Sequence, residues 1–309
     1  MLSLTVRMRT PAKSAHSRRA VHLVVMTGCL LWACGEPAEG ALEVDAPILQ
    51  QADIDQDTAA AGTPAGSATA STALKSAGCG VDPRPQGAAT IQVDGLARTY
   101  EFSLPTGYDK NRPYPLVFGF HGAGVEVSSF RTYFDMTTVV GADAIVVYPS
   151  APASSRSWSV KRDLPLFDAL LAQFEAQYCV DAKHIFAAGH SSGGMMTHAL
   201  GCQRGNVLRG IGPLSAGPPS GACVGQPAVW ISHGNADATV NVSSGRRARD
   251  FWASRNHCDV GSSKPVDPAP TVEYASCDAG SAVRYLEYEG SHNLPRYAPK
   301  GIWDFFKTL

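Results

Sequence analysis

The sequence has little charge, and what charge it has is unevenly distributed. Only 17% of the 309 residues are charged, and the formal net charge is -1. Residues 1–34 contain five Lys or Arg and no acidic residue, whereas residues 35–74 contain seven Asp or Glu and no basic residue. Residues 75–309 therefore hold 21 basic and 20 acidic residues, a net charge of about +1. Because this region lacks the clustered Lys and Arg side chains that bind phosphate, we expect no nucleic-acid partner.

The apolar run near the N-terminus, residues 20–33, is too short for a membrane-spanning helix, which needs roughly 20 apolar residues. It follows a basic region, and the combination is typical of an export signal. The run ends in Leu31-Trp32-Ala33-Cys34, which resembles the lipobox of bacterial lipoproteins, in which the cysteine is acylated. We expect a secreted protein or a cell-surface or outer-membrane lipoprotein, with lipidation at Cys34 favoured over simple cleavage or an uncleaved anchor. The only membrane contact expected is this N-terminal lipid anchor.

The segment from residue 35 to about residue 76 has no aromatic residue and is rich in Ala, Gly, Ser, Thr and acidic residues. Such a composition buries too little apolar surface to offset the conformational entropy lost on folding. We therefore predict three parts. These are a signal peptide with a lipobox over residues 1–34, a disordered tether over residues 35–77, and one folded domain over residues 78–309.

Six cysteines follow the predicted signal, and an even number in an exported protein predicts three disulfides. They allow fifteen connectivities, and the sequence does not select one. Our preferred pairing joins Cys258 to Cys277 across a polar loop, Cys179 to Cys202 around the Gly189–Gly193 motif, and Cys79 to Cys223, with free thiols as the alternative. The chain has no CxxC or HxxxH pair, so we expect no metal site.

The folded domain alternates predicted strands with predicted helices. It opens with a hairpin, residues 89–93 and 97–104 around Asp94-Gly95. Apolar runs predict buried strands at residues 115–120, 144–148, 185–188, 211–214, 228–232 and 283–288. Apolar residues at helical spacing predict helices at residues 164–178, 195–200, 245–255 and 302–308. This alternation indicates an α/β fold with a mostly parallel central sheet and helices on both faces, which binds ligands at the carboxyl ends of its strands.

The motif Gly189-His190-Ser191-Ser192-Gly193 matches GxSxG and lies directly after a predicted strand and before a predicted helix. In this sharp turn the serine is held in a strained conformation, and bulky flanking residues would collide with the neighbouring elements. The pentapeptide alone is only moderately specific. Its place between a strand and a helix predicts that Ser191 is a nucleophile.

A serine hydroxyl needs a base within hydrogen-bond reach and an acid that orients that base. We predict His292 as the base, because it lies in a loop after the last predicted strand; the alternative is an ordinary surface histidine. Asp237 follows the strand at residues 228–232 and is the predicted acid. The alternative is a loop-capping aspartate, with Asp259 or Asp278 as the acid.

The tetrahedral intermediate of acyl transfer also needs backbone donors for its oxyanion. His121-Gly122-Ala123-Gly124 follows the strand at residues 115–120, and we assign the donors to the N–H groups of Ala123 and Ser192; the alternative is a simple glycine turn. We also expect substrate contacts from His121, Gly122, Trp158 and His190. Other aromatic residues at predicted loop positions could stack on a substrate but more often pack in a core; these are Phe130, Tyr133, Phe134 and Tyr297.

Several stretches in order resemble the esterase/polyhydroxybutyrate depolymerase family, which includes carbohydrate esterases of family 1 type such as feruloyl and acetylxylan esterases. They read RTYEFSLP from residue 98, PLVFGFHG from 115, GHSSGGMM from 189, HGNAD from 233 and WDFF from 303. The resemblance implies an α/β-hydrolase fold, a catalytic triad of Ser191, Asp237 and His292, and an oxyanion site at the His121 loop.

The same resemblance implies a serine esterase. We expect a monomer that acts on an ester derived from a polymer. We expect no metal or organic cofactor, because the triad and the two backbone donors complete the acyl-transfer chemistry. The expected substrates are plant cell-wall feruloyl or acetyl esters first, short polyhydroxyalkanoates second and small acyl esters third, an order that rests on family analogy. Two alternatives remain: a tethered carbohydrate-binding lipoprotein without catalysis, and a serine peptidase, because peptidases share this fold and triad.

Overall fold

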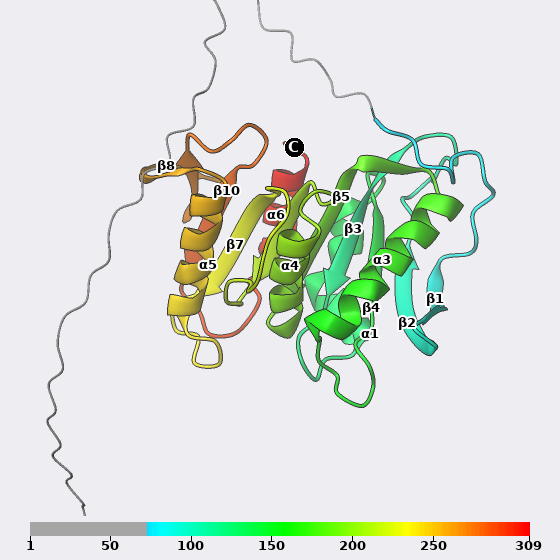
Figure 1. Cartoon of the computed structure of the whole chain (residues 1–309), viewed down its shortest axis with the longest axis horizontal. Helices are drawn as coiled ribbons and strands as arrows, with labels where there is room; N and C mark the ends of the chain where they lie inside the picture. Colours follow the sequence, from blue (N-terminus) through cyan, green and yellow to red (C-terminus); the bar gives the residue numbers. More distant parts are fainter. Residues whose placement is uncertain (1–72) are drawn as a thin grey trace, which may run out of the picture. The chain divides into compact units, whose positions relative to one another are not determined.

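The computed structural model describes residues 73–309, which form one ten-stranded sheet with helices packed against it (Figure 1). The strand order across the sheet is β1-β2-β4-β3-β5-β6-β7-β10-β9-β8. The strands are β1 (Gly87–Val93), β2 (Leu96–Ser103), β3 (Tyr114–Phe120), β4 (Ile145–Pro149), β5 (Val180–His190), β6 (Gly210–Leu214), β7 (Ala228–Gly234), β8 (Asp259–Val266), β9 (Thr271–Ala275) and β10 (Val283–Tyr288). The six central strands, β4-β3-β5-β6-β7-β10, pair in parallel. On both sides of them the pairing is antiparallel, with β2 and β1 beyond β4 and with β9 and β8 beyond β10.

Helices cover both faces of the sheet, as predicted. They are α1 (Val127–Phe134), α2 (Met136–Val140), α3 (Val160–Gln177), α4 (Ser192–Gln203), α5 (Val242–Arg255) and α6 (Ala298–Phe306). Side chains of α3, α4 and α5, such as Phe167, Leu200 and Trp252, belong to one buried cluster. Side chains of α1, α2 and α6, such as Phe130 and Ile302, belong to the cluster on the opposite face. The mostly parallel α/β architecture is therefore confirmed.

The apolar runs of the central strands are explained by burial on both faces. In β5, Ile185 and Ala187 point into the cluster beneath α3, α4 and α5, whereas Phe186 and Ala188 point into the opposite cluster. Successive side chains of a strand point to opposite faces, so a strand covered on both sides needs a continuous apolar run. This pattern made the central strands predictable.

The structure differs from the prediction between Cys258 and Cys277. This segment was predicted as a loop, but it forms the antiparallel hairpin of β8 and β9, which extends the sheet beyond β10. Seven of the eight β8 residues are exposed, so the strand carries no apolar alternation that would reveal it. The helices α1 and α2 were also missed; they are eight and five residues long.

The folded domain begins before residue 78, the predicted start. Lys75 forms an isolated bridge with Asp181, and the Leu74 N–H donates to Asp181 Oδ1 over 3.0 Å. The Ser76 hydroxyl donates to the Tyr178 carbonyl over 2.8 Å. The predicted signal peptide, Cys34 and most of the predicted tether lie outside the described residues. Within residues 73–309, every helix is too short or too polar to cross a membrane.

The disulfides join Cys79 to Cys179, Cys202 to Cys223 and Cys258 to Cys277. The last pair is the predicted one, but the predicted pairs Cys179–Cys202 and Cys79–Cys223 are wrong. The chain before β1 runs along the start of β5, where Ser76 N–H donates to Val180 O over 3.0 Å, so Cys79 lies beside Cys179.

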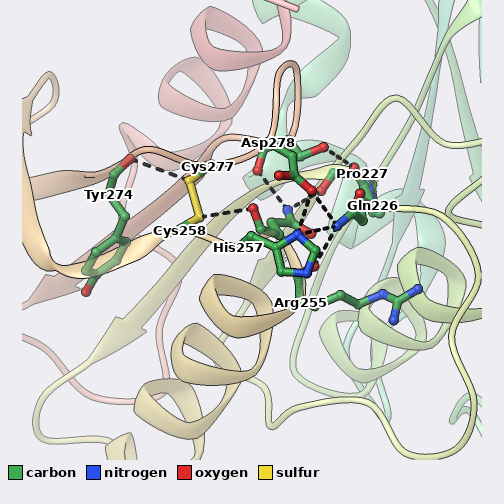
Figure 2. Close-up of a disulfide and its surroundings, with 10 residues drawn as sticks. Gln226, Pro227, Arg255, His257, Cys258, Tyr274, Cys277 and Asp278 are labelled. Carbon is green, nitrogen blue, oxygen red and sulfur yellow. Dashed lines mark hydrogen bonds and ion pairs between the residues drawn. A yellow bond between two sulfur atoms is a disulfide. The ribbon is translucent and has the colours of Figure 1, made fainter. Parts of the chain in front are cut away.

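The Cys223 loop folds onto the end of α4, because the Val224 N–H donates to Cys202 O over 2.7 Å. Figure 2 shows the third disulfide, which joins Cys258, just before β8, to Cys277, just after β9. Three disulfides are consistent with export to an oxidising compartment.

Candidate active site

Ser191 lies in a strained turn between β5 and α4. Its backbone has φ 57° and ψ -119°, which is unfavourable for a residue with a side chain. The flanking glycines are required because a Cβ on Gly193 would lie 2.0 Å from Phe120 O, and a Cβ on Gly189 would lie 2.6 Å from Gly193 O. The turn therefore combines two positions that admit only glycine with one strained position that presents the serine.

The structure brings together the three residues predicted from the motif order. His292 Nε2 lies 2.8 Å from Ser191 Oγ, and His292 Nδ1 lies 2.7 Å from Asp237 Oδ2. A carboxylate only accepts hydrogen bonds, so the Nδ1 atom must be the donor to Asp237. The Nε2 atom of neutral His292 is then the acceptor that faces the serine hydroxyl. This tautomer is the one that a general base for Ser191 requires.

Two adjacent parallel strands position the acid and the base. Asp237 follows β7 and His292 follows β10, and the ends of these strands are paired at Gly234 and Tyr288. The loops remain joined beyond the strands: the Asn235 N–H donates to Tyr288 O, and the Ala236 N–H donates to Gly290 O, each over 2.9 Å. The relative position of Asp237 and His292 therefore follows from the sheet register.

Asp237 is almost fully buried and is held as a carboxylate. Its Oδ1 accepts the N–H groups of Thr239 and Val240 over 2.9 and 2.8 Å. Burial raises the pKa of Asp237, but the hydrogen bonds from His292, Val240 and Thr239 outweigh burial and hold the pKa below its ordinary value. His233 supports this loop, because its Nε2 donates to Val240 O over 2.7 Å.

Asp278 and Asp259, the alternative candidates for the acid, form hydrogen bonds with residues outside the candidate active site. Asp278 lies 2.8 Å from His257 Nδ1 and accepts a hydrogen bond from Gln226, beside the disulfide in Figure 2. Asp259 accepts the N–H of Gly261 over 2.9 Å within β8. Neither carboxylate is hydrogen-bonded to His292.

The predicted oxyanion donors lie beside the serine. Ala123, Ser191 and Ser192 line one pocket of about 320 Å³. Ser192 is the first residue of α4, so its N–H has no partner within the helix. The carbonyl end of the peptide between Gly122 and Ala123 is anchored by two hydrogen bonds. Gly122 O accepts one from His121 Nδ1 over 2.8 Å and one from the Val125 N–H over 3.3 Å. The C=O and N–H of one trans peptide point in opposite directions, so this anchoring fixes the direction of the Ala123 N–H.

The predicted substrate contact by the His121 side chain is wrong. The side chain is 2% exposed, and its Nε2 accepts the Ala151 N–H over 3.0 Å while Nδ1 binds Gly122 O. Burial lowers the pKa of His121, which keeps the ring neutral and suits this donor and acceptor pattern. His121 instead anchors the peptide between Gly122 and Ala123, in the predicted oxyanion loop. Gly122 is buried beside the predicted nucleophile, where a Cβ would lie 3.6 Å from Ser191 Cβ.

The pocket at Ser191 has mostly apolar walls, and we call it the oxyanion-side pocket. It includes the predicted contact Trp158, whose Nε1 donates to His121 O over 2.8 Å. Six further residues line this pocket and were not predicted from the sequence, because no motif identifies them as ligand contacts. They are Ser157, Val160, Met195, Met196, Thr239 and Val240.

A second pocket of about 710 Å³ lies next to His292, and we call it the His292-side pocket. His190, a predicted contact, lines it, and its Nε2 lies 3.1 Å from His292 O. Burial, followed by the nearby His292, lowers the pKa of His190 to about 4, so the ring is neutral at pH 7. The other lining residues are Thr132, Tyr133, Asp135, Asn293, Leu294 and Arg296.

The four other aromatic residues considered as substrate contacts differ in burial and in position relative to the two pockets. Phe130 and Phe134 are fully buried in the core and do not line either pocket. Tyr133 is 41% exposed and lines the His292-side pocket, whereas Tyr297 is 39% exposed and lies outside both linings. Within residues 73–309, no three His, Cys, Asp or Glu side chains are grouped so that they could hold a metal ion.

No family model matches the chain. Feruloyl esterase D of Neurospora crassa is 28% identical over 266 residues, which cover 77% of this chain and 91% of that protein. Feruloyl esterase C of Emericella nidulans is 29% identical over 249 residues, covering 75% and 90% respectively. The solved structure of an acetyl xylan esterase from Aspergillus awamori matches with a TM-score of 0.61 at 14% identity, covering 72% of this chain and 100% of that chain. The structural match shows a shared α/β-hydrolase fold.

Proposed function

We propose that this chain, a member of the feruloyl/acetylxylan esterase-like family of α/β-hydrolases, is a serine carboxylic ester hydrolase acting on feruloyl or acetyl esters of plant cell-wall polysaccharide. The observation that carries the proposal is the continuous hydrogen-bonded series from Ser191 through His292 to Asp237, with distances of 2.8 and 2.7 Å. Its sequence relatives named as feruloyl esterases support the same chemistry.

In the proposed reaction, Ser191 Oγ attacks the ester carbonyl carbon while His292 Nε2 takes the hydroxyl proton. The Asp237 carboxylate stabilises the imidazolium that forms. The negative charge on the former carbonyl oxygen is bound by the N–H groups of Ala123 and Ser192, and each such donor contributes about 3 kcal/mol to the transition state. Collapse of the intermediate breaks the bond to the alcohol oxygen, which receives the proton from His292.

The acyl group then remains on Ser191 as an ester. Water attacks this acyl-enzyme, with His292 acting again as the base, and the carboxylic acid leaves. The oxyanion-side pocket favours a feruloyl over an acetyl group as the acyl part. Its volume of about 320 Å³ and its walls of Trp158, Met195 and Val240 suit an aromatic ring and exceed what an acetyl group would fill.

The test is hydrolysis of methyl ferulate, acetylated xylan and a polyhydroxybutyrate oligomer by the exported chain, with Ser191→Ala as the control. We expect methyl ferulate to be cleaved and the variant to be inactive. Cleavage of the polyester oligomer alone would favour a depolymerase. Binding of xylan without cleavage of any ester would favour a carbohydrate-binding module, and casein cleavage would indicate a peptidase.

We further propose that the chain is a monomeric lipoprotein of a bacterial cell surface, anchored through Cys34. The support is the Leu31-Trp32-Ala33-Cys34 sequence after a basic and apolar leader. Incorporation of labelled fatty acid into the wild-type chain, and its loss in Cys34→Ser, is the expected result. A secreted, unlabelled wild-type chain would contradict the anchor and leave the hydrolase proposal unchanged.

A further inference from the structure

We infer that the loop between β4 and α3, residues 150–159, joins the two proposed oxyanion donors to each other, and that the buried Arg98–Asp163 ion pair holds this loop in place. We call residues 150–159 the bridging loop. The inference rests on the proposed hydrolase function. It adds positioning residues, which act on the reaction only through the backbone of other residues.

The two proposed donors, Ala123 and Ser192, come from different elements of the fold. Ala123 follows β3, and Ser192 begins α4 after β5. The strands β3 and β5 are paired, but the last residues in register are Phe120 and Gly189, so each donor lies three residues beyond the paired part of its strand. An oxyanion must contact both N–H groups at about 3 Å. Strand pairing alone therefore does not fix the distance between the donors.

The bridging loop is hydrogen-bonded to the predicted oxyanion loop on both sides of Ala123. Before Ala123, the ring Nε1 of Trp158 donates to His121 O over 2.8 Å. After Ala123, the Gly124 N–H donates to Arg156 O over 2.8 Å. The backbone that carries the Ala123 N–H is thus attached to the bridging loop on either side of the donor.

The same loop is hydrogen-bonded to the start of α4 through the side chain of Ser192. Ser192 Oγ accepts the Trp158 N–H over 3.1 Å and lies 2.9 Å from Ser157 Oγ. Trp158 therefore contacts both donor elements, with its ring at His121 O and its backbone at Ser192 Oγ. Because Ser192 is the first residue of α4, a hydrogen bond to its side chain also constrains the orientation of its N–H.

Arg98 and Asp163 fix the two ends of the bridging loop. At its start, Arg98 Nη2 donates to Ser150 O over 3.0 Å, and Arg98 Nη1 lies 2.8 Å from Asp163 Oδ1. At its end, Asp163 Oδ2 accepts the Ser159 N–H over 2.7 Å. Both charged side chains are buried, where such hydrogen bonds are strong and directional. One guanidinium in β2, which β4 and β3 separate from β5, thus holds the loop that joins the donors.

The experiment measures kcat and KM for p-nitrophenyl acetate, because its small acetyl group makes few contacts with the pocket walls. Ser192→Ala removes the hydroxyl that binds Trp158 but keeps the Ser192 N–H. We expect kcat to fall about tenfold, a partial loss of one oxyanion donor, with KM nearly unchanged. Ser192→Thr keeps a hydroxyl and should recover most of this loss.

Ser244→Ala is the matched control for Ser192→Ala. Ser244 is also a half-buried serine in the first turn of a helix, and its hydroxyl accepts a hydrogen bond from Arg247 over 2.8 Å rather than from the bridging loop. This variant should have the kcat and KM of wild type.

Arg98→Lys tests the role of the ion pair. Lysine keeps the charge near Asp163, but its single ammonium lacks the fork that reaches both Asp163 and Ser150 O. We expect kcat to fall about tenfold with KM nearly unchanged. Combined with Ser192→Ala the loss should stay close to tenfold, because both substitutions release the same loop, whereas independent effects would multiply to about a hundredfold. The control Arg131→Lys, which changes another ion pair between β2 and a helix, should keep the kcat of wild type.

An unchanged kcat in Ser192→Ala, or a rise in KM in its place, would overturn the inference, because the hydroxyl would then be idle or a substrate contact. A hundredfold loss in the double variant, or a tenfold loss in either control, would overturn it as well. Urea unfolding shows which variants are folded, and the Ser192 series decides alone if Arg98→Lys does not fold. All of these outcomes leave the hydrolase function standing, which fails only if wild type cleaves neither p-nitrophenyl acetate nor methyl ferulate.

Discussion

Replacing Asp237 with Asn keeps the shape of the side chain but reverses the hydrogen-bonding character of one of its two terminal atoms. The remaining oxygen can still accept the N–H groups of Thr239 and Val240, which lie 2.9 and 2.8 Å from Oδ1. The loop therefore keeps its conformation. The new NH₂ group faces His292 Nδ1 at 2.7 Å, where two donors would oppose each other.

The imidazole can relieve this conflict by moving its proton from Nδ1 to Nε2. The proton then points at Ser191 Oγ, 2.8 Å away, and the serine has lost its base. We expect kcat to fall by about 10⁴-fold, or about 5 kcal/mol of transition-state stabilisation, with little change in KM. The assay is steady-state hydrolysis of methyl ferulate by wild type and Asp237→Asn.

Asp278→Asn is the matched control for this substitution, because Asp278 binds His257 and Gln226 rather than a residue of the candidate active site. It should retain activity close to that of wild type. A loss smaller than about tenfold in a folded Asp237→Asn protein would refute the reasoning, because the tautomer of His292 would then not depend on Asp237.

The remaining predictions concern the oxyanion loop, pH and the disulfides. His121→Ala should lower kcat for methyl ferulate by about 10- to 100-fold with a small change in KM, because the Gly122–Ala123 peptide loses its anchor; an equal rise in KM would instead indicate a substrate contact. Burial lowers the pKa of His190 to about 4 and that of His198 to about 3, against 6.5 for an ordinary histidine. Between about pH 6.5 and 4 the unfolded state thus binds more protons than the folded state. Urea titrations should show that the free energy of unfolding decreases as the pH is lowered through this range, by up to about 1.4 kcal/mol per pH unit for each histidine. A stability unchanged over this range would contradict it. Removing the Cys79–Cys179 disulfide, which spans 100 residues, should destabilise the fold by about 4.7 kcal/mol, whereas removing either of the other two disulfides should cost about 3.3 kcal/mol because their loops are shorter. The measurement is urea unfolding of variants in which both cysteines of one disulfide are replaced with Ser. A larger loss for either shorter loop would contradict the prediction.

The central sheet was predictable because its strands are buried on both faces. The residues of β5 from Ile185 to Ala188 are all apolar and all buried, so the run itself identifies the strand. The hairpin of β8 and β9 lacks this signal. It lies at the sheet edge, and its outer strand is exposed along nearly its whole length, so its backbone pairing leaves no apolar pattern in the sequence.

The proximity of Ser191, Asp237 and His292 was predictable because each follows a strand that ends at the same edge of a parallel sheet. The disulfide partners could not be predicted in the same way. Cys79 meets Cys179 because the chain before β1 folds along the start of β5, a contact between segments 100 residues apart. The pocket walls were missed for a similar reason, since Tyr133 in α1 and Arg296 in the loop between β10 and α6 line one pocket although they lie far apart in the sequence.

The central claim is that Ser191 is the nucleophile of an ester hydrolase. Its most direct test is treatment of the exported chain with a serine-directed phosphonate, followed by peptide mass spectrometry and measurement of methyl ferulate hydrolysis on the same samples. We expect one phosphonate per chain, on Ser191, and a loss of hydrolysis in proportion to labelling. A label on Ser192 or another serine, or hydrolysis that persists when Ser191 is fully labelled, would contradict the account.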